Sequence, residues 1–337
     1  MALLALKLLL GLLPVLLFLA GLVLVDSYRL IAARKVLLTI GVGCLVAALA
    51  AAGNVVLLEM LRINLSTYSR YVAPVLEETL KGAYLIYLLK SNRVGFMVDG
   101  AIRGFAIGAG FALIENMYYL YQLPQANLYL WGIRGFGTAM MHGGTTALFG
   151  IIASQLSERR PGHDWLALVP GLLVAILIHS LFNHFFLSPL LSTLVILVAV
   201  PLLITIAFQQ SERATRSWLG VGFDSDQSLL EMVKSGHLLE NRIGQYLQSL
   251  QEKFPKEAVV DMLCYLQVHL ELSIRAKGLL LLREAGFEVP SDEETNAQFV
   301  ELRYLEKSLG KTGLLALHPF LHARSKDLWQ ITMLHGN

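Results

Sequence analysis

Over its first 210 residues the chain alternates long apolar stretches with short polar connections. A membrane-spanning helix needs about 20 apolar residues at a rise of 1.5 Å each. Seven stretches meet this requirement, so the pattern predicts an all-α fold, a polytopic membrane helix bundle of about seven spans. The first stretch is too long for the apolar region of a signal peptide and lacks a cleavage site, so we interpret it as a retained span. The stretches cover approximately residues 3–25, 36–58, 71–89, 97–122, 128–153, 165–187 and 189–209.

Beyond residue 210 the pattern becomes that of a water-soluble helical segment. An amphipathic helix, broken once, is expected between Pro255 and Pro290. A second helix is expected to begin at a Ser291 cap, with Glu294 three residues on, and to end at Gly310. We therefore divide the chain into a membrane-embedded domain, 1–209, whose motifs lie at about 70–190, and a cytoplasmic helical domain, 210–337.

Composition and charge agree with this division. Of the 337 residues, 55% are hydrophobic and only 15% are charged, against about 25% charged in soluble domains. Only 8 of the 25 acidic residues lie within the first 210 positions. A formal net charge of +2 without a basic run gives no indication of nucleic-acid binding. The two cysteines, Cys44 and Cys264, fall in different domains, so neither a disulfide nor a cysteine metal cluster is expected.

The charges between the spans predict an orientation. Cytoplasmic loops carry an excess of Lys and Arg, which places the N-terminus outside and residues 210–337 inside. Arg62 and Arg70 argue against this assignment, because they fall in a connection that would face outward. The basic connections contain Arg29, Arg34 and Lys35, then Lys90 and Arg93, then Arg159 and Arg160.

Several ionisable residues lie inside the predicted spans, where a charge costs from about 2.5 to more than 10 kcal/mol. Glu77 and Glu78 are adjacent, and Lys81 follows them at helical spacing, so it can neutralise one of the two carboxylates. Asp99 and Arg103 are four residues apart and are expected to pair with each other. The remaining residues of this kind are Glu115, Arg134, His142, His179 and His184.

Counting residues from the span ends places Glu77, Glu115 and His179 at one depth, roughly 10–12 Å below the outer surface. His142 falls deeper by the same count. Small residues allow the fourth and fifth spans to approach their neighbours closely, which would bring Glu115 and His142 toward the glutamate pair. These small residues are Gly104, Gly108, Gly110 and Ala112 in the fourth span, and Gly135, Ala139 and Gly143 in the fifth.

Three motifs on successive spans resemble those of the PrsW family of intramembrane proteases. They are "EETLK" (EExxK), "FALIEN" (FxxxE followed by Asn) and "LIHSLFNH" (HxxxN). The family is similar to the CAAX prenyl endopeptidases and bacteriocin-processing (CPBP) enzymes, which show EExxxR and FxxxH instead. Here Lys81 replaces that Arg one position earlier, and Glu115 stands where the larger group has His. Both departures favour PrsW.

The resemblance implies an intramembrane endopeptidase of a prokaryotic plasma membrane, whose substrate is a membrane-anchored protein such as an anti-sigma factor. It implies that Glu77 activates water, that Glu78 assists it or holds Lys81, and that His179 and Asn183 orient the water and stabilise the oxyanion. Glu115 and His142 would complete the polar pocket, with Phe111 and Asn116 as supporting motif residues. No nucleic-acid partner is implied, and the partner of the C-terminal domain is unknown.

The sequence alone leaves two possibilities for the cofactor, a zinc ion or none. The family is often described as metalloproteases, and zinc accepts His nitrogen and carboxylate oxygen. The sequence has no HExxH motif, so we favour glutamate chemistry without a metal over a zinc enzyme. If a metal is required, the expected ligands are Glu77, Glu115, His142 and His179.

Two other classes of function remain as alternatives. Buried Glu, Lys and His residues also build proton-coupled transporters, although no inverted repeat is visible. A catalytically idle membrane scaffold is the other alternative. The polar residues could also serve packing alone, with Glu115 paired to Arg134 between spans and His142 hydrogen-bonded between helices.

Overall fold

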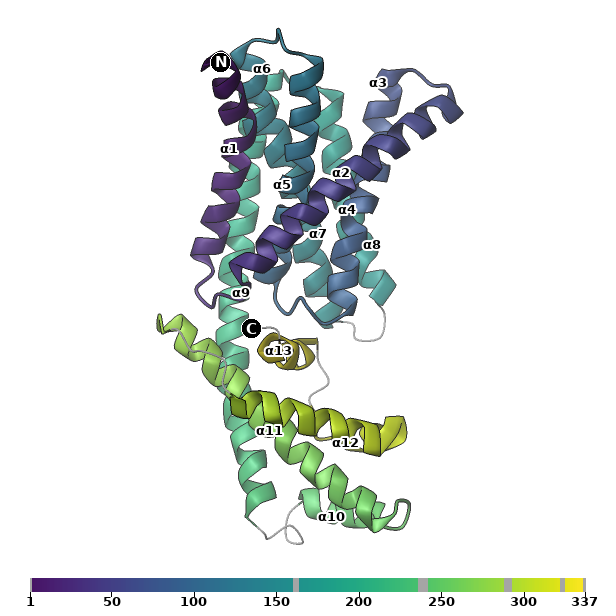
Figure 1. Cartoon of the computed structure of the whole chain (residues 1–337), viewed down its shortest axis with the longest axis vertical. Coiled ribbons are helices and arrows are strands. Elements are labelled where there is room, and N and C mark those ends of the chain that lie inside the picture. The colour runs from purple at the N-terminus through teal and green to yellow at the C-terminus, as the bar shows by residue number, and fades with distance from the viewer. Residues whose placement is uncertain (1, 160–163, 236–241, 288–292, 322–324, 336–337) are drawn as a thin grey trace. The chain divides into compact units, whose positions relative to one another are not determined.

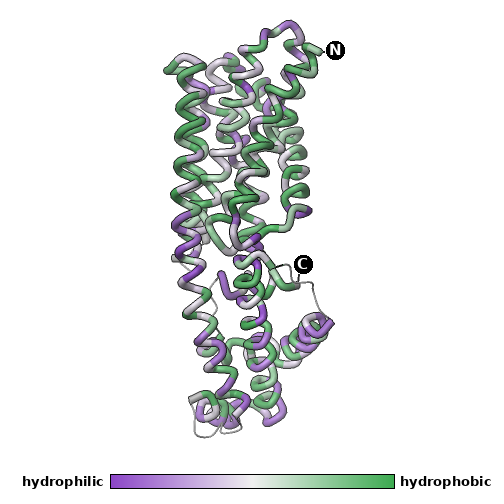
Figure 2. Tube along the Cα trace, turned by 90° about the vertical axis from the view of Figure 1, so that its left-hand side faces the viewer, coloured by the Kyte–Doolittle hydropathy of each residue, from purple (hydrophilic) through white to green (hydrophobic). Residues whose placement is uncertain are grey.

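The computed structural model describes residues 2–159, 164–235, 242–287, 293–321 and 325–335, and every element in these ranges is helical. The chain forms two compact units, Met1–Glu212 and Arg213–Asn337, here called the membrane unit and the C-terminal unit. Figure 2 shows hydrophobic residues along most of the membrane unit and alternating polar and hydrophobic residues in the C-terminal unit.

The helices of the membrane unit match the first six predicted spans closely (Figure 1). The last predicted span, 189–209, is the beginning of α9, which continues beyond Glu212 into the C-terminal unit and ends at Lys234. Five of them, α1, α2, α5, α8 and α9, are long and apolar enough to cross a membrane. The other two predicted spans are helical but carry more polar residues, in η1–α4 and in α6–η2–α7. The helical membrane fold is thus confirmed, and the seven crossings stay a prediction. The elements are α1 (Ala2–Val25), α2 (Ala33–Leu61), α3 (Leu65–Thr67), η1 (Tyr68–Val72), α4 (Ala73–Lys90), α5 (Met97–Gln122), α6 (Leu128–Ile133), η2 (Arg134–Thr138), α7 (Ala139–Arg159), α8 (Asp164–His184) and α9 (Pro189–Lys234).

Helix α5 forms the centre of the membrane unit, and its residues from Val98 to Ala112 are buried. It packs against α1, α2 and α7, and α2 crosses it obliquely in Figure 1. The predicted close packing by small residues is confirmed. A Cβ added at Gly104 would lie 2.3 Å from the carbonyl oxygen of Thr146 on α7, and one at Gly110 would lie 2.1 Å from that of Ile40 on α2.

Among the described residues of the membrane unit, two π-helical turns interrupt the α-helices, and each lies immediately before a helix with motif or candidate residues. The turn η1 (Tyr68–Val72) precedes α4, which carries Glu77, and η2 (Arg134–Thr138) precedes α7, which carries His142. Such π-bulges are frequent at functional sites. The predicted Asp99–Arg103 pair on α5 is confirmed, with Arg103 Nε 2.5 Å from Asp99 Oδ1.

In its described residues the C-terminal unit contains the end of α9 and four further helices around an apolar core. The expected break between Pro255 and Pro290 was wrong, since α11 runs unbroken. The expected end at Gly310 corresponds to a sharp kink, because Gly310 has φ 60° and ψ −175°. Ser291 lies outside the described residues. The helices are α10 (Arg242–Leu250), α11 (Lys256–Glu284), α12 (Glu293–Leu317) and α13 (Ser325–His335).

Candidate active site

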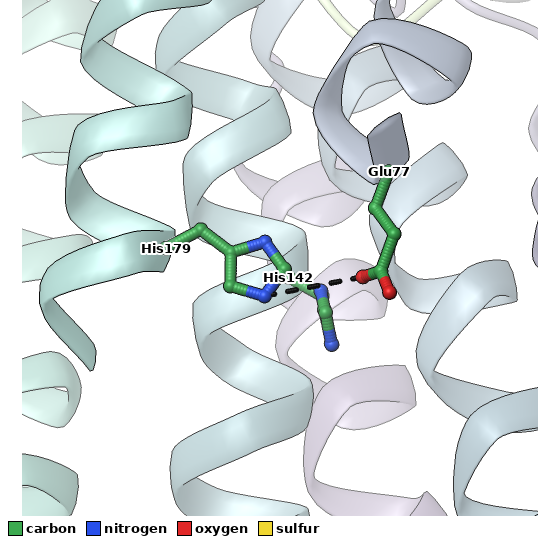
Figure 3. A group of neighbouring side chains, drawn as sticks. All are labelled: Glu77, His142 and His179. Carbon is green, nitrogen blue, oxygen red and sulfur yellow. Dashed lines mark ion pairs between the residues drawn. The ribbon is translucent and has the colours of Figure 1, made fainter. Parts of the chain in front are cut away.

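Three predicted site residues from three different helices meet inside the membrane unit. Glu77 on α4, His142 on α7 and His179 on α8 each present a donor atom within 4.8 Å of the others (Figure 3). Glu77 Oε2 lies 3.9 Å from His179 Nε2. Both histidines are buried, while the Glu77 side chain is 13% exposed. The group therefore combines a shielded interior with one partly accessible carboxylate.

Glu78 lies behind this group and holds it in place. Its Oε1 accepts hydrogen bonds from Lys81 Nζ (2.5 Å) and from His179 Nδ1 (2.8 Å). The hydroxyl of Thr145 lies 3.4 Å from both of its oxygens. Glu78 and Lys81 are almost fully buried, so each compensates the charge of the other. Because Nδ1 of His179 is used here, its Nε2 faces Glu77.

His142 is held on both sides. Its Nε2 lies 3.0 Å from Glu115 Oε2, and its Nδ1 lies 3.1 Å from Lys81 Nζ. Its ring also contacts those of Phe111, at 5.0 Å between centroids, and His179, at 4.9 Å. The close crossing of α5 and α7 permits this arrangement, since a Cβ at Gly108 would lie 2.1 Å from the His142 carbonyl oxygen.

Glu115 forms the outer edge of the site and is 27% exposed. Arg134 Nη2 lies 3.4 Å from Glu115 Oε2, so these two residues pair as in the alternative in which they serve packing alone. Arg134 in turn donates from Nε to Asn116 Oδ1 (2.8 Å), and its guanidinium lies 3.8 Å from the centroid of the Tyr119 ring. Asn116 is anchored to α1 by donating to the carbonyl of Gly11 (2.7 Å). The second motif therefore positions Glu115 through Arg134.

Asn183 makes a different contact from the one implied by its motif. Its amide donates to the carbonyl of Ser69 (2.9 Å) in the π-helical turn η1. One turn earlier on α8, Ser180 donates to the carbonyl of Arg70 (2.6 Å). Together these two side chains tie α8 to η1, directly before the helix that carries Glu77. In this geometry Asn183 supports the site from outside the Glu77–His142–His179 group.

Sequence reasoning missed three residues of the site. Asn54 on α2 donates to Glu77 Oε1 (2.9 Å), and Tyr68 in η1 donates to Asn54 Oδ1 (2.8 Å). Thr145 contacts Glu78 from α7. Asn54 could have been found from the sequence, because it is an amide within the apolar segment "AAAGNVVLL". Polar side chains inside spans are usually hydrogen-bonded between helices.

The chemistry of these donors fits a zinc-type site. Catalytic zinc has three protein ligands of His and carboxylate type and an open position. Two such ligands on a tetrahedral ion lie about 3.3 Å apart, close to the 3.9 Å between Glu77 Oε2 and His179 Nε2. Glu78 on Nδ1 of His179 completes the carboxylate–histidine arrangement that orients a metal-binding imidazole. Because the Lys81 ammonium can only donate, His142 Nδ1 accepts from it and Nε2 carries the proton toward Glu115. For His142 to coordinate a metal, one of these two contacts would have to be given up.

The fold and the site together define a class of protein, a helical membrane protein with a buried carboxylate–histidine cluster. A family model described as "PrsW family intramembrane metalloprotease" matches residues 32–206, just over half of the chain. The chain belongs to the PrsW family of intramembrane proteases, which confirms the resemblance of its motifs. The family description favours a metal-dependent centre over the metal-free chemistry preferred from the sequence. No curated protein and no solved structure matches the chain.

Proposed function

We propose that this chain is a metal-dependent intramembrane endopeptidase that cleaves a membrane-anchored, single-span protein, with anti-sigma-factor-like proteins as the substrate class. The observation that carries the proposal is the meeting of Glu77, His142 and His179 within 4.8 Å inside the membrane unit. These three residues would hold a zinc ion. A zinc ion in such a site polarises the scissile carbonyl and makes a water molecule more acidic.

The carboxylates of the chain divide the remaining tasks. With Glu77 engaged in holding the metal, Glu115 is the accessible carboxylate next to the group, 3.0 Å from His142, and it takes the proton from the attacking water. Arg134 keeps Glu115 turned toward His142. Glu78 stays buried with Lys81 and fixes the orientation of His179. Without a metal, Glu77 would be the base that takes the proton from water. Glu115 would then only complete the polar pocket, so the two mechanisms differ in whether Glu115 acts as the base.

The depth of the site determines where the cut falls. By residue count, Glu77, Glu115 and His179 lie in the outer half of the bilayer when the N-terminus is outside and the C-terminal unit is cytoplasmic, the orientation that we propose. A substrate helix must unwind before attack, and it unwinds more readily near its end, where freed backbone groups reach water. Cleavage therefore falls within about two helical turns of the extracytoplasmic interface.

A comparison of membrane-anchored fragments tests the proposal. Cells that produce the wild type, Glu77→Gln or Glu59→Gln are compared by mass spectrometry of released and retained fragments. Glu59 is an exposed acid on α2 and serves as the matched control. We expect fragments with wild type and Glu59→Gln that are absent with Glu77→Gln. Identical fragment sets for Glu77→Gln and wild type would refute the proposal, and cuts at the cytoplasmic end would refute the orientation.

A further inference from the structure

Two residues outside the three motifs contact the catalytic centre through a chain of hydrogen bonds. The hydroxyl of Tyr68 donates to Asn54 Oδ1 (2.8 Å), and Asn54 Nδ2 donates to Glu77 Oε1 (2.9 Å). Tyr68 is 3% exposed. We propose that Asn54 and Tyr68 are positioning residues that aim the Glu77 carboxylate at His179. This inference rests on the proposed role of Glu77.

The contact with Asn54 decides which way the carboxylate points. The terminal torsion of a Glu side chain is broad and roughly two-fold, so a free carboxylate samples many orientations. Asn54 holds Oε1 on the side of α2, which leaves Oε2 directed at His179 Nε2, 3.9 Å away. Residues that hold metal ligands in this way are worth about 10- to 100-fold in metal affinity or activity.

Tyr68 decides which end of the Asn54 amide faces Glu77. An amide has an acceptor end and a donor end of nearly the same shape. If the amide were reversed, its oxygen would face the Glu77 carboxylate, and two acceptors would meet without a proton between them. By donating to Oδ1, the phenol selects the orientation in which the NH₂ group faces Glu77. Tyr68 therefore acts on Glu77 through Asn54.

The pair is not needed to hold α2 against its neighbours. A Cβ at Gly53 would lie 3.1 Å from the Leu76 side chain on α4, and Val46, Ala47 and Ala50 pack with Phe111. On the other side of α2, Val55 is 58% exposed. An amide in such an apolar stretch finds few alternative partners in lipid, so its hydrogen bonds to Tyr68 and Glu77 persist.

The test compares zinc affinity and cleavage kinetics in the purified full-length chain. The variants are Asn54→Leu, Tyr68→Phe and the double variant, and zinc affinity is measured by competition with a chromophoric chelator. We expect Asn54→Leu to lower zinc affinity and kcat 10- to 100-fold with KM unchanged. Tyr68→Phe, which removes one oxygen atom, should cause a smaller loss. In the Asn54→Leu background it should cause no further loss, because its effect passes through the amide.

The controls are Tyr71→Phe, a hydroxyl deletion at an exposed position of the same π-helical turn, and Val55→Ala on α2. Both should behave as wild type. Wild-type affinity and kcat in Asn54→Leu would overturn the positioning role, as would a full additional loss from Tyr68→Phe in the double variant. A wild type that neither binds zinc nor cleaves overturns the proposed function itself. If the wild type cleaves without zinc, the comparison of kcat among Asn54→Leu, Tyr68→Phe and the double variant still decides whether the two residues position Glu77.

Discussion

The crossing of α5 and α7 at Gly108 offers a sharp test of how the site is assembled. A Cβ at this position would lie 2.1 Å from the carbonyl oxygen of His142 and 2.7 Å from Cα of Gly143. Both neighbours are backbone atoms, which cannot rotate away as a side chain can. The substitution Gly108→Ala therefore forces the two helices apart.

The required displacement follows from the distances. An ordinary contact of a Cβ atom is at least 3.4 Å, whereas the added Cβ lies 2.1 Å from the His142 carbonyl oxygen. That oxygen, and α7 with it, must therefore move about 1.3 Å away from the Cβ. His142 moves with it, away from Glu115 and from the other two residues of the group. A displacement of about 1 Å can cost about 100-fold in rate. Overpacking of this kind also typically destabilises the fold by about 1–3 kcal/mol.

The assay is cleavage of a purified single-span substrate in proteoliposomes, with thermal unfolding of the same sample in detergent. Gly21→Ala is the matched control, because a Cβ at Gly21 on α1 meets nothing within 4 Å. We expect Gly21→Ala to match wild type and Gly108→Ala to lose about 100-fold in kcat. If Gly108→Ala were as stable and as active as Gly21→Ala, α5 and α7 would not approach each other this closely at Gly108.

Three further predictions follow from buried contacts. Glu78→Leu and Lys81→Met should each lower stability by about 3–5 kcal/mol, because each leaves a buried charge unpaired. The double variant should recover stability but not cleavage, because His179 Nδ1 has then lost its acceptor, and recovery of cleavage would exclude a role of Glu78 in orienting His179. Asn183→Ala should lower stability by about 1 kcal/mol through loss of its bond to Ser69 and also reduce kcat, whereas unchanged kinetics would exclude a supporting role. In the C-terminal unit, Lys277→Met should lower the unfolding temperature by leaving Asp226 buried without its ion pair, and an unchanged temperature would show that the pair adds no stability.

The sequence predicted the helices and part of the site because both depend on local spacing. Apolar periodicity located the helices of the membrane unit, and counting residues brought Glu77 and His179 to one level. The same count placed His142 deeper, whereas the structure brings it to Glu115. The fifth predicted span begins with α6 and the π-helical turn η2, so its residues do not advance by a uniform α-helical rise.

Contacts between distant helices could not be predicted in this way. The bond between Asn54 and Glu77 depends on how α2 crosses the bundle and on the π-helical turn that carries Tyr68. The resemblance of the motifs implied that Asn183 orients the water together with His179. In the structure its amide donates to the carbonyl of Ser69 in the π-helical turn η1. One break was expected between Pro255 and Pro290, but packing of Leu272, Ala276 and Leu280 keeps α11 continuous.

The most direct test of the central claim is zinc content and cleavage rate measured in the same purified samples. The samples are wild type, Glu77→Gln, Glu115→Gln and Glu59→Gln. We expect wild type and Glu59→Gln to retain zinc and to cleave, Glu77→Gln to lose both, and Glu115→Gln to retain zinc but to lose about 100- to 10,000-fold in rate. Full activity of zinc-free wild type would contradict the metal centre, and cleavage by Glu77→Gln at the wild-type rate would contradict the catalytic site as a whole.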